Sequence, residues 1–261
     1  MAVANVVVDK RLLEVLKPFP ARCGVRTDPS GKTIKNIVLS TISDPEYDLL
    51  RPHLEQVALP HHFILHHPGQ RMDFAYFVNE GMVSLVVTMN EGRSVEVGVV
   101  GREGMVGTAL VVGIQQAPYC AIMQIPGSGV RISSQTLEEI LAQCPELRLQ
   151  LNRYAHVQGL QVAQIAACNR VHEIAQRLAR WLLMCQDRVD SELLFLTHEF
   201  LGEMLGTGRP TVSLAAGILQ RSELIENLRG TIQIINRKGL EAAACECYGV
   251  IQHFNGGLGL R

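Results

Sequence analysis

The sequence lacks a long hydrophobic run, a signal peptide and an excess of charge of one sign. Its 261 residues are 47% hydrophobic, but no segment approaches the roughly 18 consecutive apolar residues that a membrane-spanning helix needs. Charged residues between Asp9 and Glu14 interrupt the N-terminal apolar residues before a signal-peptide core can form. We therefore expect a cytoplasmic protein without membrane contact, with one large or two ordinary domains. The formal net charge of −1 gives no sign of a nucleic-acid partner, because phosphate contacts favour a basic surface.

Disulfide pairs and catalytic motifs are also missing. The seven cysteines are odd in number and scattered along the chain, which argues against a disulfide framework and fits reduced thiols. Only Cys245 and Cys247 are close in sequence, and we interpret them as buried or half-exposed thiols in preference to metal or iron–sulfur ligands. The sequence contains no Ser–His–Asp or Cys–His constellation, P-loop or G-x-G-x-x-G fingerprint. We therefore expect no enzyme, no bound metal and no cofactor.

Turn-forming residues divide the first half of the chain. Five prolines and glycines between positions 18 and 31 predict a flexible N-terminal extension over residues 1–36. A short helix is expected at residues 44–56, with Asp44 as its N-cap. From residue 57 to 133, short Val- and Ile-rich runs alternate with turn signals at Asn79-Glu80-Gly81, Asn90-Glu91-Gly92 and Pro126-Gly127. Such runs are typical of hairpins in an antiparallel barrel or roll, and we place the first domain at residues 37–136.

A long helical pattern follows at residues 137–169. Its stripe of recurring positions has a spacing of three or four residues and consists of Leu147, Leu151, Tyr154, Val157, Gln161, Gln164 and Cys168. A long helix beside a small barrel has little of its own chain to cover, so we predict that this stripe pairs with the same helix of a second copy. Asn169 is the predicted break before a further helix.

The most informative segment is residues 196–225, LTHEFLGEMLGTGRPTVSLAAGILQRSELI. It predicts a short helix with an apolar face, a tight turn at Gly206, and a second helix capped by Thr207 or Gly208. The second helix is expected to bury Val212, Ala215, Ala216 and Leu219. A predicted hairpin over residues 228–235, with Arg229-Gly230 at its turn, follows directly. Together these elements match a helix-turn-helix with a wing.

A helix-turn-helix presents the N-terminal residues of its second helix to base edges in the major groove of DNA. We expect Arg209 to read a base, because a guanidinium donates two hydrogen bonds to guanine O6 and N7. Phosphate contacts are expected near helix N-termini, from Thr197, His198 and Thr211. The other residues of the predicted DNA-binding surface are Thr207, Gly208, Ser213, Leu214 and Arg229. Between residues 204 and 240, five basic residues stand against two acidic ones, so a local charge of +3 is hidden in the neutral total.

The order of roll, long helix and winged helix-turn-helix resembles the Crp/Fnr family of bacterial transcription regulators. The resemblance spans about residues 40–250 and rests on the segment 196–225, the wing LRGTIQIINRKGLE and the roll segment GREGMVGTALVVG. It implies an α+β fold with a β-roll sensor domain, a dimerisation helix, a DNA-binding domain at residues 170–250 and a C-terminal tail at residues 251–261. It also implies a homodimer on a palindromic operator in double-stranded DNA, with half-sites about 34 Å apart, and contact with RNA polymerase if the protein is an activator.

The sensor positions depart from those of family members that bind cyclic nucleotides. The Gly-Glu-Leu segment of those members, in which Glu binds the ribose, corresponds here to Gly107, Thr108 and Ala109. Their phosphate-binding Arg, followed by Ser or Thr, corresponds to Pro118 and Tyr119. Because an anionic phosphate without a cationic partner is poorly held in a buried pocket, we predict that cyclic AMP and cyclic GMP are not the effector. The iron–sulfur members need four cysteines, mostly near the N-terminus, where this chain has one.

Two alternatives stay open. A regulator of the same family can respond to a cyclic nucleotide, to haem or to a redox signal, with candidate residues Cys120, Cys168, His156 and His172. A cupin-like metal-binding enzyme is suggested by histidines at positions 61, 62, 66 and 67, but cupin sites resemble H-x-H and no H-x-H occurs here.

The second helix of the predicted helix-turn-helix has Arg209, Pro210 and Leu214 where other family members have an Arg-Glu-x-x-x-Arg pattern, so we expect a different operator.

Overall fold

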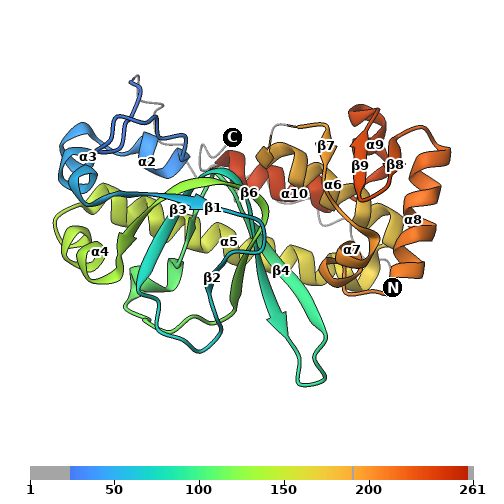
Figure 1. The fold of residues 1–261 in the computed structure, drawn as a ribbon, viewed down its shortest axis with the longest axis horizontal. Helices are drawn as coiled ribbons and strands as arrows, with labels where there is room; N and C mark the ends of the chain where they lie inside the picture. The colour runs from blue at the N-terminus through green and yellow to red at the C-terminus, as the bar shows by residue number, and fades with distance from the viewer. Residues whose placement is uncertain (1–23, 190, 258–261) are drawn as a thin grey trace, which may run out of the picture.

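The computed structural model describes residues 24–189 and 191–257 and shows a β-roll and a mainly helical domain joined by one long helix (Figure 1). The main sheet of the roll is antiparallel and contains, in order, β1 (Glu55–Leu59), β6 (Cys120–Ser133), β3 (Phe74–Thr88) and β4 (Ser94–Val100). Two short strands extend it: β2 (Ile64–His66) pairs with β6, and β5 (Met105–Val106) pairs with β3. The predicted α+β architecture is confirmed.

The long strands β3 and β6 run through two of the predicted turns. Asn79-Glu80-Gly81 lies inside β3 and Pro126-Gly127 inside β6, where the pairing register is irregular. Gly81 has a φ of +87°, and a Cβ added there would lie 2.3 Å from the carbonyl oxygen of Ile125. The glycines therefore serve a bulge at which two strands approach closely, and the prediction of turns at these two places is wrong. Asn90-Glu91-Gly92, in contrast, forms the turn between β3 and β4.

Residues 24–36 are anchored to the roll, which contradicts the predicted flexible extension over this part. Ile34 is buried, and the fully buried Asn36 donates from Nδ2 to the carbonyl oxygens of Val78 at 3.0 Å and Gly104 at 2.8 Å. Local proline and glycine content could not reveal these long-range contacts. The rest of the predicted extension, residues 1–23, lies outside the described residues.

Short helices accompany the strands of the roll: α2 (Ile37–Thr41), α3 (Asp44–Leu50), η1 (Arg51–His53) and η2 (Thr108–Val112). Ser43, one residue before the predicted Asp44, is the N-cap of α3. The predicted helix at residues 137–169 is two helices, α4 (Ser134–Leu141) and α5 (Pro145–Val171), because Pro145 has no amide hydrogen and cannot continue α4. α6 (Ile174–Val189) follows a break after Val171 rather than at Asn169.

The predicted stripe of α5 packs inside its own chain. Leu147, Leu151 and Val157 are fully buried, and Gln161 and Cys168 are also buried. The Tyr154 ring fills the space that a Cβ at Gly104 would occupy. The prediction that this stripe pairs with a second copy is therefore wrong, since the roll and the C-terminal helix cover it. A sequence period identifies a buried face but not the element that buries it.

The second domain contains the remaining elements: β7 (Leu193–Leu194), α7 (His198–Met204), α8 (Arg209–Arg221), β8 (Ile225–Leu228), β9 (Thr231–Ile234), α9 (Arg237–Ala243) and α10 (Cys247–Gly257). α10 includes residues 251–257 of the predicted tail, so that part of the prediction is wrong; residues 258–261 lie outside the described residues. Ile251 is fully buried, and Phe254 packs against the hydrophobic core of the roll. None of the described helices combines the length and apolarity needed to cross a membrane.

Two buried polar contacts fix α6 on the roll. The guanidinium of Arg188 contacts Glu103 Oε1 through Nε at 2.8 Å and Nη2 at 2.7 Å, and both side chains are almost completely buried. Trp181 Nε1 donates to Glu96 Oε1 at 2.7 Å, and Ser84 donates to the other carboxylate oxygen of Glu96. Burial raises the pKa of Glu96 to about 7 against these hydrogen bonds.

We expect the Glu96 carboxyl to weaken the folded state as the pH rises. Unfolded Glu96 loses its proton near its ordinary pKa of 4.5, whereas the folded carboxyl keeps its proton up to about 7. The free energy of unfolding of the wild type, relative to Glu96→Gln, should therefore fall by on the order of 2–3 kcal/mol between pH 5 and pH 8. Urea unfolding monitored by the fluorescence of Trp181, the single tryptophan, measures this. Glu91→Gln, at the exposed hairpin turn, is the matched control, and equal pH profiles for wild type and Glu96→Gln would contradict the assignment.

Candidate nucleic-acid interface

The helix-turn-helix is formed by α7 and α8 and depends on local capping. Thr197 is the N-cap of α7, and its hydroxyl accepts a hydrogen bond from the amide of Phe200 at 3.2 Å. Gly206, with a φ of +61°, makes the turn, and Gly208 is the N-cap of α8. The predicted inner face of α8 is confirmed, because Val212, Ala215, Ala216 and Leu219 are buried.

The predicted DNA-binding residues of α8 lie on its outer surface. Arg209 is the first residue of the helix and is exposed, as are Thr211, Ser213 and Leu214. Leu214 is 72% exposed, so most of its aliphatic side chain is open to a partner. Thr207 is half-buried in the turn. The first two turns of the helix therefore offer one guanidinium, short hydroxyl side chains and the side chain of Leu214 to a partner.

The wing is the hairpin of β8 and β9, with Arg229-Gly230 at its turn and a φ of +74° at Gly230. Asn227 of β8 ties the wing to α8, since its Nδ2 donates to Gln220 Oε1 at 2.7 Å. His198 lies between the two as well, with Nδ1 at 3.0 Å from Ser213 Oγ and Nε2 at 3.3 Å from Asn227 Oδ1. His198 thus has a structural role that its position at a helix N-terminus did not suggest, and sequence reasoning missed Asn227 altogether.

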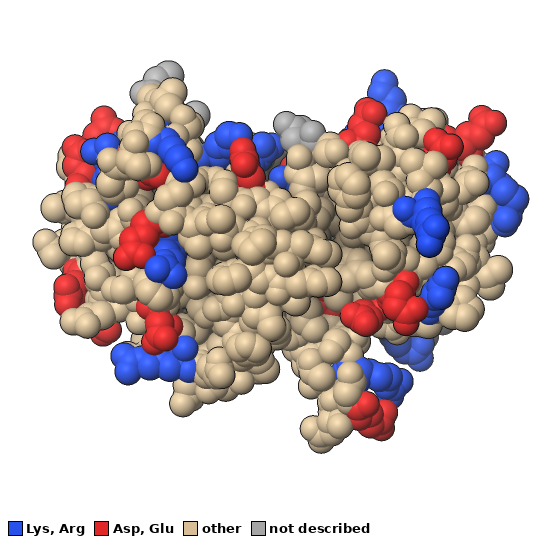
Figure 2. Space-filling model, in the orientation of Figure 1, with Lys and Arg blue, Asp and Glu red and all other residues tan. Residues whose placement is uncertain are grey.

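The charge of this surface is smaller than the sequence count suggests. Arg237 forms ion pairs with Asp187 at 2.7 Å and Glu241 at 2.9 Å, so its charge is largely neutralised. The exposed basic side chains that remain near α8 and the wing are Arg209, Arg221, Arg229 and Lys238. In Figure 2, basic and acidic side chains alternate over the end of the molecule where these elements lie. The basic excess is therefore local to α8 and the wing turn.

The hairpin between β3 and β4 lies beside the start of α8. Together they line a groove of about 570 Å³, with Met89, Arg93 and Val95 on the side of the roll and Glu199, Gly202 and Arg209 on the other. Gly206 is close enough that an added Cβ would contact Val95 at 3.3 Å. The sensor domain therefore touches the helix-turn-helix directly, at the end that carries Arg209.

Two family models match this architecture. Residues 176–243 match the Crp-like helix-turn-helix domain, and residues 56–144 match the cyclic nucleotide-binding domain. Together they account for more than half of the chain. The chain belongs to the Crp/Fnr family. It is therefore a transcription regulator with a DNA-binding helix-turn-helix and a cyclic-nucleotide-binding-like sensor domain.

Relatives of known name share this plan. The global nitrogen regulator of Synechocystis sp. is 24% identical over 181 residues, which is 65% of this chain and 79% of that protein. A solved Crp/Fnr regulator from Thermus thermophilus is 25% identical, with a TM-score of 0.54 over 73% of this chain and 98% of its own. The c-di-GMP-responsive global regulator of Xanthomonas campestris is 16% identical, with a TM-score of 0.62 over 74% of this chain and 99% of its own.

The structure brings together only part of the predicted Crp/Fnr effector pocket. Gly107 and Thr108 begin η2, and Thr108 Oγ1 donates to Gln158 Oε1 of α5 at 3.1 Å. Burial raises the pKa of Tyr119 against a hydrogen bond with Thr108, so these two side chains meet. Ala109 is half-buried and Pro118 is exposed. The polar groups at this place satisfy one another, and none of the five residues is cationic.

The four histidines near the start of the roll do not form a cupin-like centre. His61 and His62 are exposed, and their rings stack at 3.8 Å. His66 is buried, which lowers its pKa to about 4, whereas His67 is exposed. Side chains divided between the interior and the solvent in this way do not share a metal ion.

Proposed function

We propose that the chain is a homodimeric, sequence-specific regulator that binds a palindromic operator through α8 and the wing. The observation that carries this proposal is the exposed N-terminal turn of α8, with Arg209 at its tip, inside a helix-turn-helix of the Crp/Fnr family. Arg209 reads a base, and the hydroxyl side chains of Thr197, Thr207, Thr211 and Ser213 face the phosphates. Leu214 packs against a thymine methyl group, and Arg229 of the wing holds the DNA backbone. Such a protein works in the cytoplasm, and as an activator it would contact RNA polymerase.

The dimer is expected to form through the outer face of α5, the side opposite the stripe that packs inside the chain. The residues exposed on this face are Leu149, Asn152, His156, Gly159, Ala163, Ala166 and Arg170, at a spacing of three or four. Its middle part is made of small residues, which let two helices approach closely. On a palindromic operator, the two α8 helices of such a dimer are expected at half-sites about 34 Å apart, one turn of DNA.

Arg209→Ala tests base reading. If Arg209 donates two hydrogen bonds to a guanine, the change should cost about 1–3 kcal/mol of binding free energy on the operator and little on random DNA. Genomic footprinting of the purified protein supplies the operator, and fluorescence anisotropy measures both affinities. Arg229→Ala is the comparison, because a phosphate contact weakens binding to both DNAs alike. Equal losses on both DNAs for Arg209→Ala would make Arg209 a phosphate contact instead.

Ala163→Glu tests the dimer face. A carboxylate from each copy would meet at the close approach of the two helices, so the variant should be monomeric and lose affinity for the palindrome. Light scattering after gel filtration should give the mass of two 28.8 kDa chains for the wild type and of one for the variant. Ala142→Glu, exposed after α4, should stay dimeric. A dimeric Ala163→Glu would place the interface elsewhere.

The sensor domain is expected to respond to something other than cyclic AMP or cyclic GMP. Thr108 is bonded to Gln158 where the family's ribose-binding Glu stands, and no cationic side chain is present among the five matched positions for a phosphate. Calorimetry with cyclic AMP and cyclic GMP at millimolar concentration should give no binding heat, and operator affinity should not change. Micromolar binding of either nucleotide would contradict this and favour the alternative of a cyclic-nucleotide-responsive regulator.

A further inference from the structure

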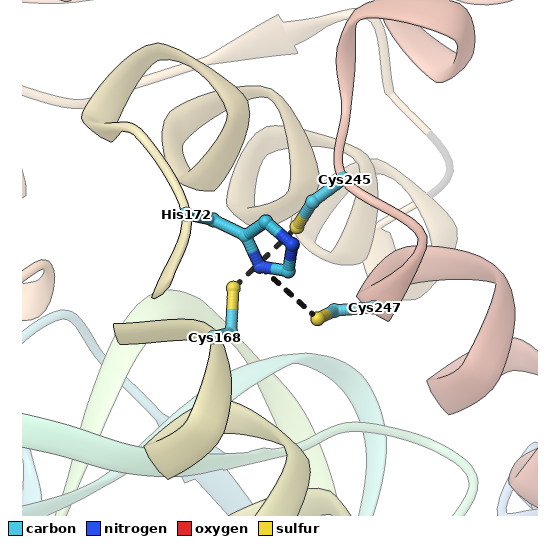
Figure 3. Close-up of side chains that lie close together, drawn as sticks. All are labelled: Cys168, His172, Cys245 and Cys247. Atoms are coloured by element: carbon cyan, nitrogen blue, oxygen red, sulfur yellow. Dashed lines mark hydrogen bonds between the residues drawn. The ribbon is translucent and has the colours of Figure 1, made fainter. Parts of the chain in front are cut away.

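Four side chains from distant parts of the chain converge at the end of α5. They are Cys168 and His172 at the C-terminus of α5, Cys245 just after α9, and Cys247 at the start of α10 (Figure 3). Their ligand atoms all lie within 4.8 Å of one another. The three thiols are buried and His172 is half-buried, so the group is closed off from most of the solvent.

The spacing of these atoms fits one tetrahedral ion. Zinc bonds of about 2.3 Å to sulfur and about 2.0–2.1 Å to nitrogen place two sulfurs about 3.8 Å apart, and a sulfur and a nitrogen about 3.5 Å apart. The Sγ atoms of Cys168 and Cys245 are 3.4 Å apart, and Cys247 Sγ is 3.5 Å from His172 Nδ1. A polynuclear cluster would require greater separations, because its ligands bind different metal atoms.

The surroundings of the four side chains also match a metal site. His172 turns Nδ1 toward the thiols and Nε2 toward Glu246, whose carboxylate oxygens lie at 3.1 and 3.2 Å. Metal-ligating histidines usually donate their second ring N–H to a carboxylate in this way. Gln164 Nε2 donates to Cys247 Sγ at 3.0 Å, as a donor to a thiolate would.

Charge balance favours the same occupant. Three thiolates and one divalent cation leave a net charge of −1, which needs compensation in a buried place. Arg177 and Arg180 of α6 lie within electrostatic range of these thiols. Binding releases the thiol protons to the solvent, so no oxidant or reductant is required.

We infer that Cys168, His172, Cys245 and Cys247 bind one zinc ion, or a thiophilic divalent ion of similar preference, in a closed Cys3His site. A disulfide between Cys168 and Cys245 would not explain why Cys247 and His172 converge on the same place. A closed site with four protein ligands is structural rather than catalytic. Under this inference, Cys245 and Cys247 are metal ligands and not the simple thiols expected from the sequence.

A bound ion would restrict motion at the break between α5 and α6, where the two domains are connected. It links the last turn of α5, next to the break that leads into α6, to the segment that starts α10. α10 in turn bonds back to α5, where Gln161 Nε2 donates to Asn255 Oδ1 at 2.7 Å. The binding of the ion does not rest on the proposed function. Only a consequence for DNA affinity, through the position of the helix-turn-helix, rests on the proposed function.

Metal content of the full chain, purified under reducing conditions, tests the inference. We expect one zinc per chain by mass spectrometry, and Co²⁺ added to the metal-free chain should give the thiolate charge-transfer and tetrahedral d–d bands of a Cys3His site. Cys247→Ser and His172→Ala should each lose both signals, while Cys120→Ser, a half-buried thiol outside the group, should keep them. Circular dichroism of each variant shows whether it is folded.

A second variant gives a graded result. Glu246→Gln keeps all four ligands but weakens the support of His172, so zinc affinity should fall on the order of 10–100-fold. Glu226→Gln, exposed on the wing, should leave zinc affinity unchanged. A metal-free reduced chain without cobalt bands, a Cys168–Cys245 disulfide, or iron with sulfide would each overturn the inference. DNA binding is measured separately, so a chain that fails the metal tests but still binds its operator would overturn the site and leave the proposed function intact.

Discussion

The arrangement of the two domains depends on the buried ion pair between Arg188 and Glu103. Both charges are removed from water where α6 meets the roll, and the guanidinium also donates to the carbonyl oxygen of Met184 at 2.9 Å. A buried ion pair adds little stability compared with apolar packing, but either charge left alone is very costly. The pair therefore fixes the position of α6 on the roll, because any other position would leave one of the two charges buried without its partner. The nearby hydrogen bond between Trp181 and Glu96 restricts the position of α6 in the same way.

Sequence reasoning located the helix-turn-helix and the wing because their signals are local. Gly206 and Gly230 adopt positive φ values within a few residues of the helices and strands that they join, and the inner face of α8 repeats at the helical period. The antiparallel roll was predicted for a similar reason, from short β-branched runs between glycines. At Gly81, the glycine permits the close approach of β3 to Ile125 of β6, and the same local signal led to the wrong prediction of a turn in place of a bulge.

The features that escaped prediction are contacts between distant residues. The period of α5 identified its buried side, but only the structure shows that the roll and α10 cover it, which leaves the opposite side exposed. Asn36 binds backbone oxygens of Val78 and Gly104, far along the chain, and nothing around it signals this. Cys168 and Cys245 are 77 residues apart, so their meeting has no counterpart in the spacing of the sequence.

The position of α10 has a consequence for the order in which the protein is made. Translation proceeds from the N-terminus, so the roll, α5 and the helix-turn-helix leave the ribosome before Cys245, Cys247 and α10. Until then, α10 does not cover the side of α5 around Gln161, and Cys168 and His172 lack their two cysteine partners. The contacts of α6 with the roll can thus form first, and α10 adds the last contacts to α5, as the final helix to be synthesised among those described.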